Sequence, residues 1–439
     1  MPAEKCAEKK SIKKENKLKK ITAPKRLCGI LLAALTVISV SGAKVNAAAT
    51  LTDAKQGLPL YYNSLTEDEK NIYIHLRQGV MNNKEKIDTI VIKNTESYNK
   101  LCELILYNDD LAFNLGGIAA STTGSMSTFT PTYAIDNFTY SLMLDEMDKK
   151  AEAIAKKARK IEDEYSRIEF IHDEIAKNCE YFPESDPEAY VGYTHYAYGA
   201  LVEGKAVCQG YSAAFSYVCQ KSNIQCITVY GTSRDENHSW NKVLCDGKWY
   251  NVDLTWDDSV SNFKDNINHN YFMLSDLEIA RDHTFKNFVG TDKPADETRD
   301  CFTERGLCAN DNTEAIGMFE TLLTEQAKSG GLSATISFAN DRAFRNFVKY
   351  IEYNDRGRMK NLLKRVKKAS GADIKTGSTW YFTDQDHRTV TFVLVYNGAA
   401  LSDYFNYPEL IDEKNLETYK KLGLKIDIPE KKEEKAVTK

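Results

Sequence analysis

The sequence contains no Cys-x-x-Cys pair, fewer basic than acidic residues beyond its first 47 positions, and only one apolar run long enough to be considered for a membrane. Without paired cysteines, a structural zinc site is not indicated. Three histidines, His195, His269 and His283, lack a ligand-like spacing, so we expect neither a metal nor another cofactor. With 42% hydrophobic and 11% aromatic residues, the chain is nevertheless typical of globular proteins.

The basic charge is concentrated at the N-terminus. Residues 1–47 hold 11 of the 58 Lys and Arg residues but 3 of the 63 Asp and Glu residues, which leaves 47 basic and 60 acidic residues for the remainder. A body with this excess of acidic residues argues against nucleic-acid binding, which relies on clustered Lys and Arg.

An apolar run follows this basic block. Leu27–Ala43 contains no charged residue, and the small residues at 45–49 suit signal peptidase. A basic start, an apolar stretch and a small-residue cleavage site predict a signal peptide over residues 1–47. An uncleaved anchor is the alternative, but a membrane span needs about 20 apolar residues. We therefore expect a secreted or cell-surface bacterial protein that does not contact the membrane after cleavage.

Local patterns predict several elements in the rest of the chain. A capping box at Ser64 and Glu67 predicts a helix that runs to about Asn83. Alternating or β-branched runs predict strands, and apolar residues at three- and four-residue spacing predict helices. The strands are expected at 87–92, 133–142, 333–338, 379–382 and 389–396, and the helices at 144–160, 313–328 and 341–368.

Cys208 lies just after a glycine-containing loop, at the predicted start of a helix. Tyr211, Phe215 and Cys219 recur at helical spacing after it. Free N–H groups and the helix dipole at such a position stabilise a thiolate, and those N–H groups can also bind an oxyanion. A buried structural cysteine is the alternative and the commoner fate of this residue type.

A β-hairpin is predicted around Asp246-Gly247, a strong signal for a two-residue turn between alternating runs. If Cys245 pairs with Lys248, His238 lies one diagonal step from Asp253 on the same face of the hairpin. The carboxylate could then accept a hydrogen bond from the Nδ1–H of His238. A surface histidine beside a solvated aspartate is the alternative for the hairpin taken alone.

Cys208, His238 and Asp253 suit the three roles of a thiol triad: a nucleophile, a proton shuttle and the group that orients the shuttle. The segments that hold them are YGALVEGKAVCQGYSAAFSYVC, HSWNKVLCDGKWYNVDLTWDD and the following NYFMLSD. In this order they resemble motifs of bacterial members of the transglutaminase-like superfamily, over roughly residues 160–285. The resemblance implies that these three residues are the catalytic triad.

The resemblance also implies a papain-like α+β core, in which the cysteine helix packs against an antiparallel sheet. We expect the following organisation: a signal peptide (1–47), a helix-rich region (48–160), a transglutaminase-like catalytic domain (161–290), a small α/β domain (310–400) and a C-terminal tail (401–439).

The implied reaction is acyl-thioester chemistry on amide bonds. With water as acceptor, the protein would be a cysteine peptidase or amidase on protein or cell-wall peptides. With an amine acceptor it would be a protein-glutamine γ-glutamyltransferase that cross-links proteins, and deamidation is a further outcome of that activity. A catalytically silent binding module is the third alternative. Gln209 follows the cysteine where animal cross-linking enzymes usually have Trp, and no acidic loop resembles a calcium site, which favours the hydrolase.

Three further residues are candidates for the substrate or oxyanion site. Gln209 is adjacent to the cysteine, Tyr198 precedes it by ten residues, and Trp240 lies two residues beyond His238. Simple packing roles for Tyr198 and Trp240 are the alternative.

Overall fold

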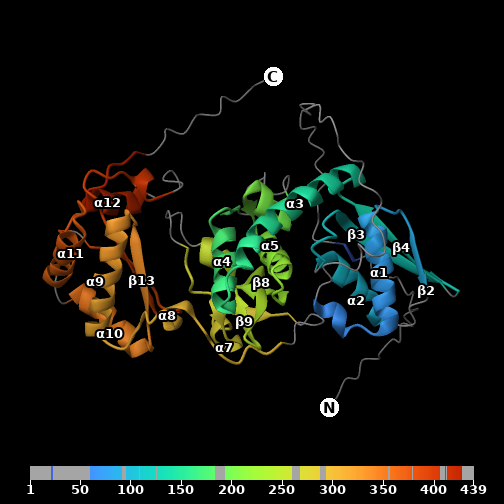
Figure 1. Ribbon diagram of the computed structural model, residues 1–439, viewed down its shortest axis with the longest axis horizontal. Coiled ribbons are helices and arrows are strands. Elements are labelled where there is room, and N and C mark those ends of the chain that lie inside the picture. The colour runs from blue at the N-terminus through green and yellow to red at the C-terminus, as the bar shows by residue number, and fades with distance from the viewer. Residues whose placement is uncertain are drawn as a thin grey trace, which may run out of the picture. The chain divides into compact units, whose positions relative to one another are not determined.

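Helices and antiparallel strands alternate along the chain in the computed structural model, which confirms the α+β class. The described residues are 21–22, 60–90, 95–107, 109–124, 126–182, 193–259, 267–286, 293–353, 356–377, 379–405, 411 and 413–427. The chain divides into two units, residues 1–58 with 65–142 and residues 59–64 with 143–439 (Figure 1). Apart from 21–22, the expected signal peptide lies outside the described residues. Within them, none of the helices combines the length and apolar composition that a bilayer crossing requires.

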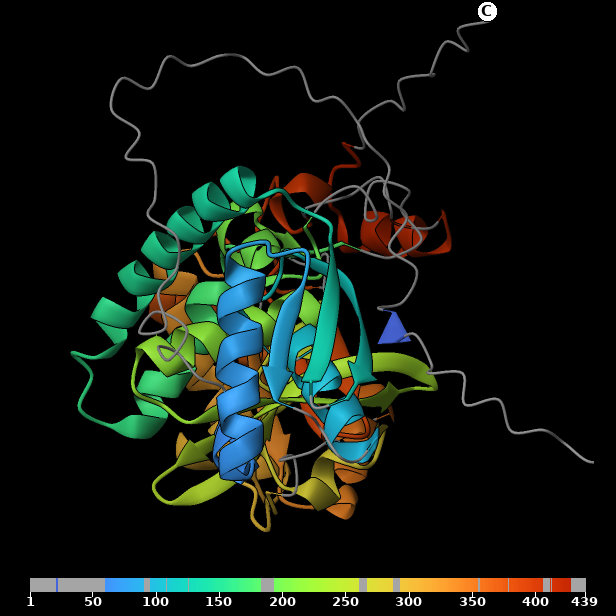
Figure 2. The same ribbon diagram turned by 90° about the vertical axis from the view of Figure 1, so that its right-hand side faces the viewer.

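The first unit is built on a four-stranded sheet with the order β1-β3-β4-β2. Its strands are β1 (Ile21–Thr22), β2 (Ile87–Ile90), β3 (Leu115–Thr123) and β4 (Met126–Tyr133), and its helices are α1 (Glu67–Met81) and α2 (Thr95–Tyr107). Figure 2 shows α1 lying lengthwise beside these strands. The β3–β4 hairpin was not predicted, so this region contains more sheet than the sequence analysis expects.

Two predicted boundaries in this unit are wrong. The capping box of α1 uses Thr66 and Glu69 instead of Ser64 and Glu67: the Thr66 N–H donates to the Glu69 carboxylate at 2.9 Å. The strand expected at 133–142 is interrupted because Asp136 accepts hydrogen bonds from the N–H groups of residues 138 and 139. These hydrogen bonds cap the N-terminus of a helix, and α3 (Asn137–Ala158) begins there.

The second unit contains a five-stranded antiparallel sheet with the order β10-β9-β8-β7-β11. Its strands are β7 (Cys226–Ser233), β8 (Glu236–Cys245), β9 (Lys248–Val252), β10 (Phe272–Leu274) and β11 (His283–Phe285). Helix α5 (Cys208–Lys221) packs on β7 and β8, and α4 (Glu164–Ala176) packs on α5 (Figure 1). This is the expected arrangement of a cysteine helix against an antiparallel sheet.

Close backbone contact at the start of α5 requires a glycine. A side-chain carbon on Gly210 would lie 2.2 Å from the carbonyl oxygen of Thr194. Such an approach is possible only for glycine. Gly210 therefore lets the residues before the helix pack against its first turn, beside Cys208.

The β8–β9 hairpin has the predicted register, with Cys245 opposite Lys248 and Asn241 opposite Val252. The second strand, however, ends at Val252 instead of continuing to residue 256. Helix α6 (Leu254–Ser259) starts immediately afterwards, because Asp253 accepts hydrogen bonds from the two backbone N–H groups that follow at 255 and 256. The strand end thus places Asp253 at a turn.

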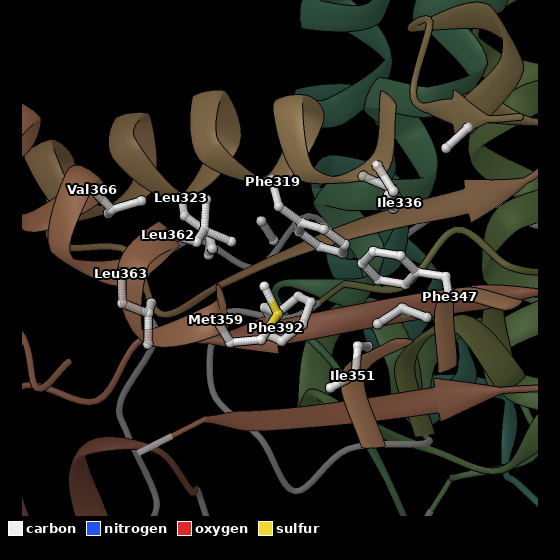
Figure 3. Packing of buried hydrophobic residues seen from close by; sticks show 14 of the residues in the cluster. Phe319, Leu323, Ile336, Phe347, Ile351, Met359, Leu362, Leu363, Val366 and Phe392 are labelled. Carbon is white, nitrogen blue, oxygen red and sulfur yellow. The ribbon is translucent and has the colours of Figure 1, made fainter. Parts of the chain in front are cut away.

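The C-terminal part has a separate four-stranded sheet, β12-β13-β15-β14. Its elements are β12 (Cys308–Ala309), α9 (Asn312–Ser329), β13 (Ser333–Phe338), α10 (Asp341–Tyr353), α11 (Arg356–Ser370), β14 (Trp380–Asp384) and β15 (Thr389–Val393). The single basic helix expected at 341–368 is thus two helices. Figure 3 shows side chains of α9, such as Phe319 and Leu323, packed toward Phe392 of β15.

The region expected to be a tail, residues 401–439, contains further folded elements. A 3₁₀ turn (Leu401–Asp403) and helix α12 (Glu413–Leu422) contribute to an apolar cluster around Trp380. Tyr404 and Tyr419 pack on the Trp380 ring, with centroid distances of 5.3 and 5.2 Å. The small domain therefore extends beyond residue 400.

Candidate active site

Cys208 is the first residue of α5, as its sequence context predicts. The preceding residue, Val207, has extended backbone geometry, and Gly204 makes the left-handed turn that ends a short π-helix (Gly199–Glu203). The cysteine side chain is partly exposed and lies beside His238, whose pKa it helps to raise. A solvent-accessible thiol therefore lies at a helix N-terminus beside an imidazole.

His238 lies on β8, opposite Gly231 of β7. Its Nε2–H donates to the Asp253 Oδ2 atom at 2.6 Å. The hairpin register predicts the Nδ1–H as this donor, and that prediction is wrong. Asp253 lies beyond the end of β9, where the ring nitrogen more distant from the His238 backbone reaches it. The Nδ1 atom is thereby left for the cysteine.

Asp253 is fully buried and accepts four hydrogen bonds. Its Oδ1 atom accepts the N–H groups of Thr255 and Trp256 at 3.0 and 3.2 Å. Its Oδ2 atom accepts from His238 and also from the Nε2–H of His283, at 2.9 Å. Burial by itself would raise the pKa of Asp253, but the charge and hydrogen bond of His238, with His283, lower it well below its usual range.

His283 is a site residue that the sequence analysis missed. It lies on β11, which pairs with β7, and its Nδ1 atom hydrogen-bonds to the Asp282 carboxylate at 2.6 Å. Burial disfavours its charged form, but hydrogen bonds to Asp253 and Asp282 raise its pKa. The only local signal was the adjacent Asp-His pair, because nothing in the sequence indicates that β11 joins the sheet beside β7.

The electrostatics favour a protonated His238. Burial alone would lower its pKa, but the charge and hydrogen bond of Asp253, with a further hydrogen bond to Cys208, raise it to about 10. At neutral pH the imidazole is therefore protonated and can form an ion pair with a neighbouring thiolate.

Two tryptophans flank the His238 ring. Trp240 is buried and stacks on it with a centroid distance of 6.2 Å, while its indole N–H donates to Asn251. Trp256 lies 6.2 Å away on α6, and its indole N–H donates to Ser233 at 2.9 Å. Both rings pack against the imidazole, and Trp240 is 1% exposed.

Gln209 and Tyr198, the other two candidates for the substrate or oxyanion site, have different surroundings. Gln209 is the second residue of α5, is partly buried, and its carbonyl accepts from the hydroxyl of Ser212. The Tyr198 hydroxyl instead donates to Glu146 of α3 at 3.0 Å. Gln209 is therefore adjacent to the thiol, whereas the Tyr198 hydroxyl is directed to a carboxylate on another helix.

All eight cysteines between residues 48 and 439 have free thiols. Cys301 and Cys308, which are seven residues apart in the sequence, are not bonded to each other: the first begins the short helix α8 (Cys301–Glu304) and the second begins β12. Most of these thiols are buried, but Cys308 is partly exposed, as Cys208 is.

Among the described residues, three groups have side chains close enough to share a metal ion. They are His238 with Asp253 and His283, His172 with Asp173 and His269, and Glu164 with Cys245 and Asp246. The first group coincides with the candidate triad, whose hydrogen bonds already use these atoms.

Comparisons with known proteins agree with this geometry. Residues 152–254 match the Transglutaminase-like superfamily. The chain is 31% identical to the kyphoscoliosis peptidase of Mus musculus over 96 residues, which are 18% of this chain and 14% of that protein. The Homo sapiens protein matches with the same identity and coverage. The chain thus spans about a seventh of the length of these relatives.

Solved structures show a more distant likeness. The crystal structure of a TGase is 14% identical with a TM-score of 0.23, and the match covers 40% of this chain and 52% of that one. The periplasmic domain of TgpA from Pseudomonas aeruginosa is 14% identical with a TM-score of 0.21, covering 30% and 53%. The sequence match contains Cys208, His238 and Asp253, so residues 152–254 of this chain form a transglutaminase-like domain.

Proposed function

We propose that this protein is an exported cysteine peptidase or amidase that acts on protein or cell-wall peptides. The observation that carries the proposal is the linked arrangement of three side chains. Cys208 at the start of α5 lies beside His238, whose Nε2–H donates to the buried Asp253 carboxylate at 2.6 Å.

The reaction starts from the ion pair that forms when the Cys208 thiol has passed its proton to the Nδ1 atom of His238. The sulfur then attacks the carbonyl carbon of an amide, and the backbone N–H groups of the first turn of α5 stabilise the oxyanion. The His238 imidazolium returns its proton to the leaving amine, and a thioester forms. Water, deprotonated by the same histidine, hydrolyses this thioester and frees the thiol.

Asp253 keeps His238 in the orientation and charge state that these steps need. Its four hydrogen bonds hold the carboxylate rigidly, and its charge stabilises the imidazolium that forms when the thiol is deprotonated. Proton transfer by a positioned base contributes about 10²- to 10⁴-fold to the rate.

Two observations favour water over an amine as acceptor. Gln209 occupies the position after Cys208 where the animal cross-linking enzymes have Trp. The related mouse and human proteins carry the name peptidase. Hydrolysis is therefore the leading outcome, and transfer to an amine is the alternative that an experiment must distinguish.

The test is incubation of the purified protein with cell-wall peptides and, separately, with a mixture of Gln- and Lys-containing proteins and a labelled amine. Mass spectrometry then follows the products. We expect cleaved peptide or released ammonia from the wild type, no product from Cys208→Ala or His238→Ala, and normal activity from the control Cys308→Ala. Incorporation of the amine as the main product would identify an acyltransferase instead. No turnover by the wild type would support a binding module.

Export is part of the same proposal and has its own test. Expression of the full chain in a Gram-positive host, followed by N-terminal sequencing of the protein in the medium, should give a start near residues 48–50. Retention in the membrane fraction with an intact N-terminus would favour the anchor.

A further inference from the structure

A second cluster of histidine and aspartate side chains lies apart from the triad. His172 and Asp173 are consecutive on α4, and His269 precedes β10. The Asp173 Oδ1 atom lies 3.1 Å from His172 Nδ1 and 2.9 Å from His269 Nε2. Three potential ligand atoms thus converge on one point from two separate segments.

A further carboxylate, that of Asp257, orients the ring of His172. The other ring nitrogen of His172, Nε2, lies 3.1 Å from the Asp257 Oδ2 atom on α6. Both side chains are fully buried. When histidine binds a metal through one nitrogen, the other usually donates to a carboxylate in this way, which holds the ring and makes it a better ligand.

We propose that His172 Nδ1, Asp173 and His269 Nε2 bind a zinc ion. Nitrogen and carboxylate ligands bind Zn²⁺ at about 2.0–2.2 Å, so neighbouring ligand atoms of a tetrahedral site lie about 3.3 Å apart. The two separations from Asp173, 3.1 and 2.9 Å, need only small shifts to reach that spacing, and the two ring nitrogens lie within 4.8 Å of each other. The ion replaces the protons that the two ring nitrogens donate to Asp173 in its absence.

Water can complete the coordination. The side chains of Asp173 and His269 are 23% and 10% exposed, whereas that of His172 is fully buried. The site is therefore anchored on its inner side by His172 and opens to solvent at the other two ligands. Imidazole and carboxylate are ligands that suit Zn²⁺ over Mg²⁺ or Ca²⁺.

Zinc at this position would stabilise the loop that supports the catalytic aspartate. Asp257 accepts the N–H of Tyr271 at 2.9 Å, and the Tyr271 carbonyl accepts the N–H of Asp253 at 3.0 Å. The ion therefore joins α4 to the segment that begins at His269 and, through Asp257, to α6. We expect a structural effect, since Cys208, His238 and Asp253 supply the chemistry.

The first experiment titrates Zn²⁺ into the full chain, expressed without a histidine tag and stripped with a chelator, by calorimetry. We expect one ion per chain and a rise in Tm with zinc. His269→Ala should weaken binding by about 100-fold or more, and Asp257→Asn by about 10- to 100-fold. The control His75→Ala, on the exposed face of α1, should bind as the wild type does.

Binding that is equal in His269→Ala and wild type, or an absence of binding to the wild type, would overturn the proposal. If His269→Ala does not fold, Asp173→Asn replaces it, because this side chain is more exposed.

A second measurement does not depend on any variant. Co²⁺ bound to the wild type should show the visible absorption bands of a tetrahedral nitrogen and oxygen site. A sulfur-to-cobalt charge-transfer band would instead place the ion at Cys208 or Cys245 and contradict the assignment.

Discussion

The interior of the transglutaminase-like domain and the interior of the C-terminal domain differ in kind. The interior of the transglutaminase-like domain contains His172, Asp253, Asp257 and His283, each no more than 3% exposed. The C-terminal domain buries a continuous set of aliphatic and aromatic side chains between α9, α11 and its sheet (Figure 3). The first interior holds reactive groups in defined charge states, and the second provides stability.

This difference has an energetic consequence. A buried charge is tolerated only with partners, and removal of one partner leaves the other uncompensated. A buried apolar side chain instead contributes in proportion to the area and volume that it fills. Substitutions in the first interior should therefore change activity and its pH dependence, whereas those in the second should change stability alone.

The largest effect is expected for Asp253→Asn. The amide keeps the size of the carboxylate but removes the charge that stabilises the His238 imidazolium. We expect kcat to fall by about 10⁴-fold with little change in fold, by analogy with the same change in other triads. Steady-state kinetics with circular dichroism as a folding control checks this, and an activity within tenfold of wild type would contradict the role of Asp253.

The same substitution should alter the pH dependence of stability. Because the pKa of His238 is raised to about 10, its interaction with Asp253 stabilises the fold fully below the unfolded value of about 6.5 and is lost as the pH rises toward 10. Denaturant unfolding should therefore show a decline over that window in the wild type. The decline should be smaller in Asp253→Asn, and an identical slope in both would count against the pairing.

The next largest effect belongs to the apolar interior. Phe319 is fully buried and packs edge-on against Phe392 with a centroid distance of 4.5 Å. Phe319→Ala should lower the free energy of unfolding of this domain by about 3–5 kcal/mol. Thermal or denaturant unfolding measures this, while kcat of the folded fraction should stay at the wild-type value. A large loss of kcat would show that the two interiors are coupled.

A smaller effect is expected for His283, the second histidine on Asp253. A hydrogen bond to a charged group contributes about 1.5–3 kcal/mol, so His283→Ala should lower kcat by about 10- to 100-fold with KM nearly unchanged. His283→Gln retains an N–H donor and should recover part of the loss. If neither variant differs from the control His75→Ala, the second histidine does not position the carboxylate.

The smallest effect is expected on the surface of the C-terminal domain. Arg365 and Glu320 form a bidentate pair with N–O distances of 2.8–2.9 Å, but both side chains are more than a third exposed. Solvent screening limits such pairs, so Arg365→Ala should lower the free energy of unfolding by less than about 1 kcal/mol. Chemical denaturation would show whether the loss exceeds this limit.

Sequence patterns predicted those features of the fold that depend on residues close together in the chain. The strand at 333–338, the helix start at Cys208 and the register set by Asp246-Gly247 all follow from local periodicity or turn chemistry. Helix boundaries were harder to predict, because Thr66-x-x-Glu69 and Ser64-x-x-Glu67 are equally good capping-box patterns and the structure uses the first.

Contacts between distant segments could not be predicted. His283 reaches Asp253 because β11 pairs with β7, and His172 reaches His269 because α4 packs beside the loop before β10. The same limit applies to the question of which ring nitrogen of His238 bonds to Asp253, because the answer depends on where β9 ends. These are tertiary effects for which a single sequence carries no periodic signal.

The central claim is that His238 activates Cys208, and the most direct measurement is site-resolved alkylation. The protein is treated with iodoacetamide at pH 7, and mass spectrometry gives the rate for each cysteine, with the partly exposed Cys308 as an internal control. We predict that Cys208 reacts about tenfold or more faster than Cys308 and that His238→Ala removes this advantage. Equal rates at the two cysteines, or a Cys208 rate unaffected by His238→Ala, would contradict the account.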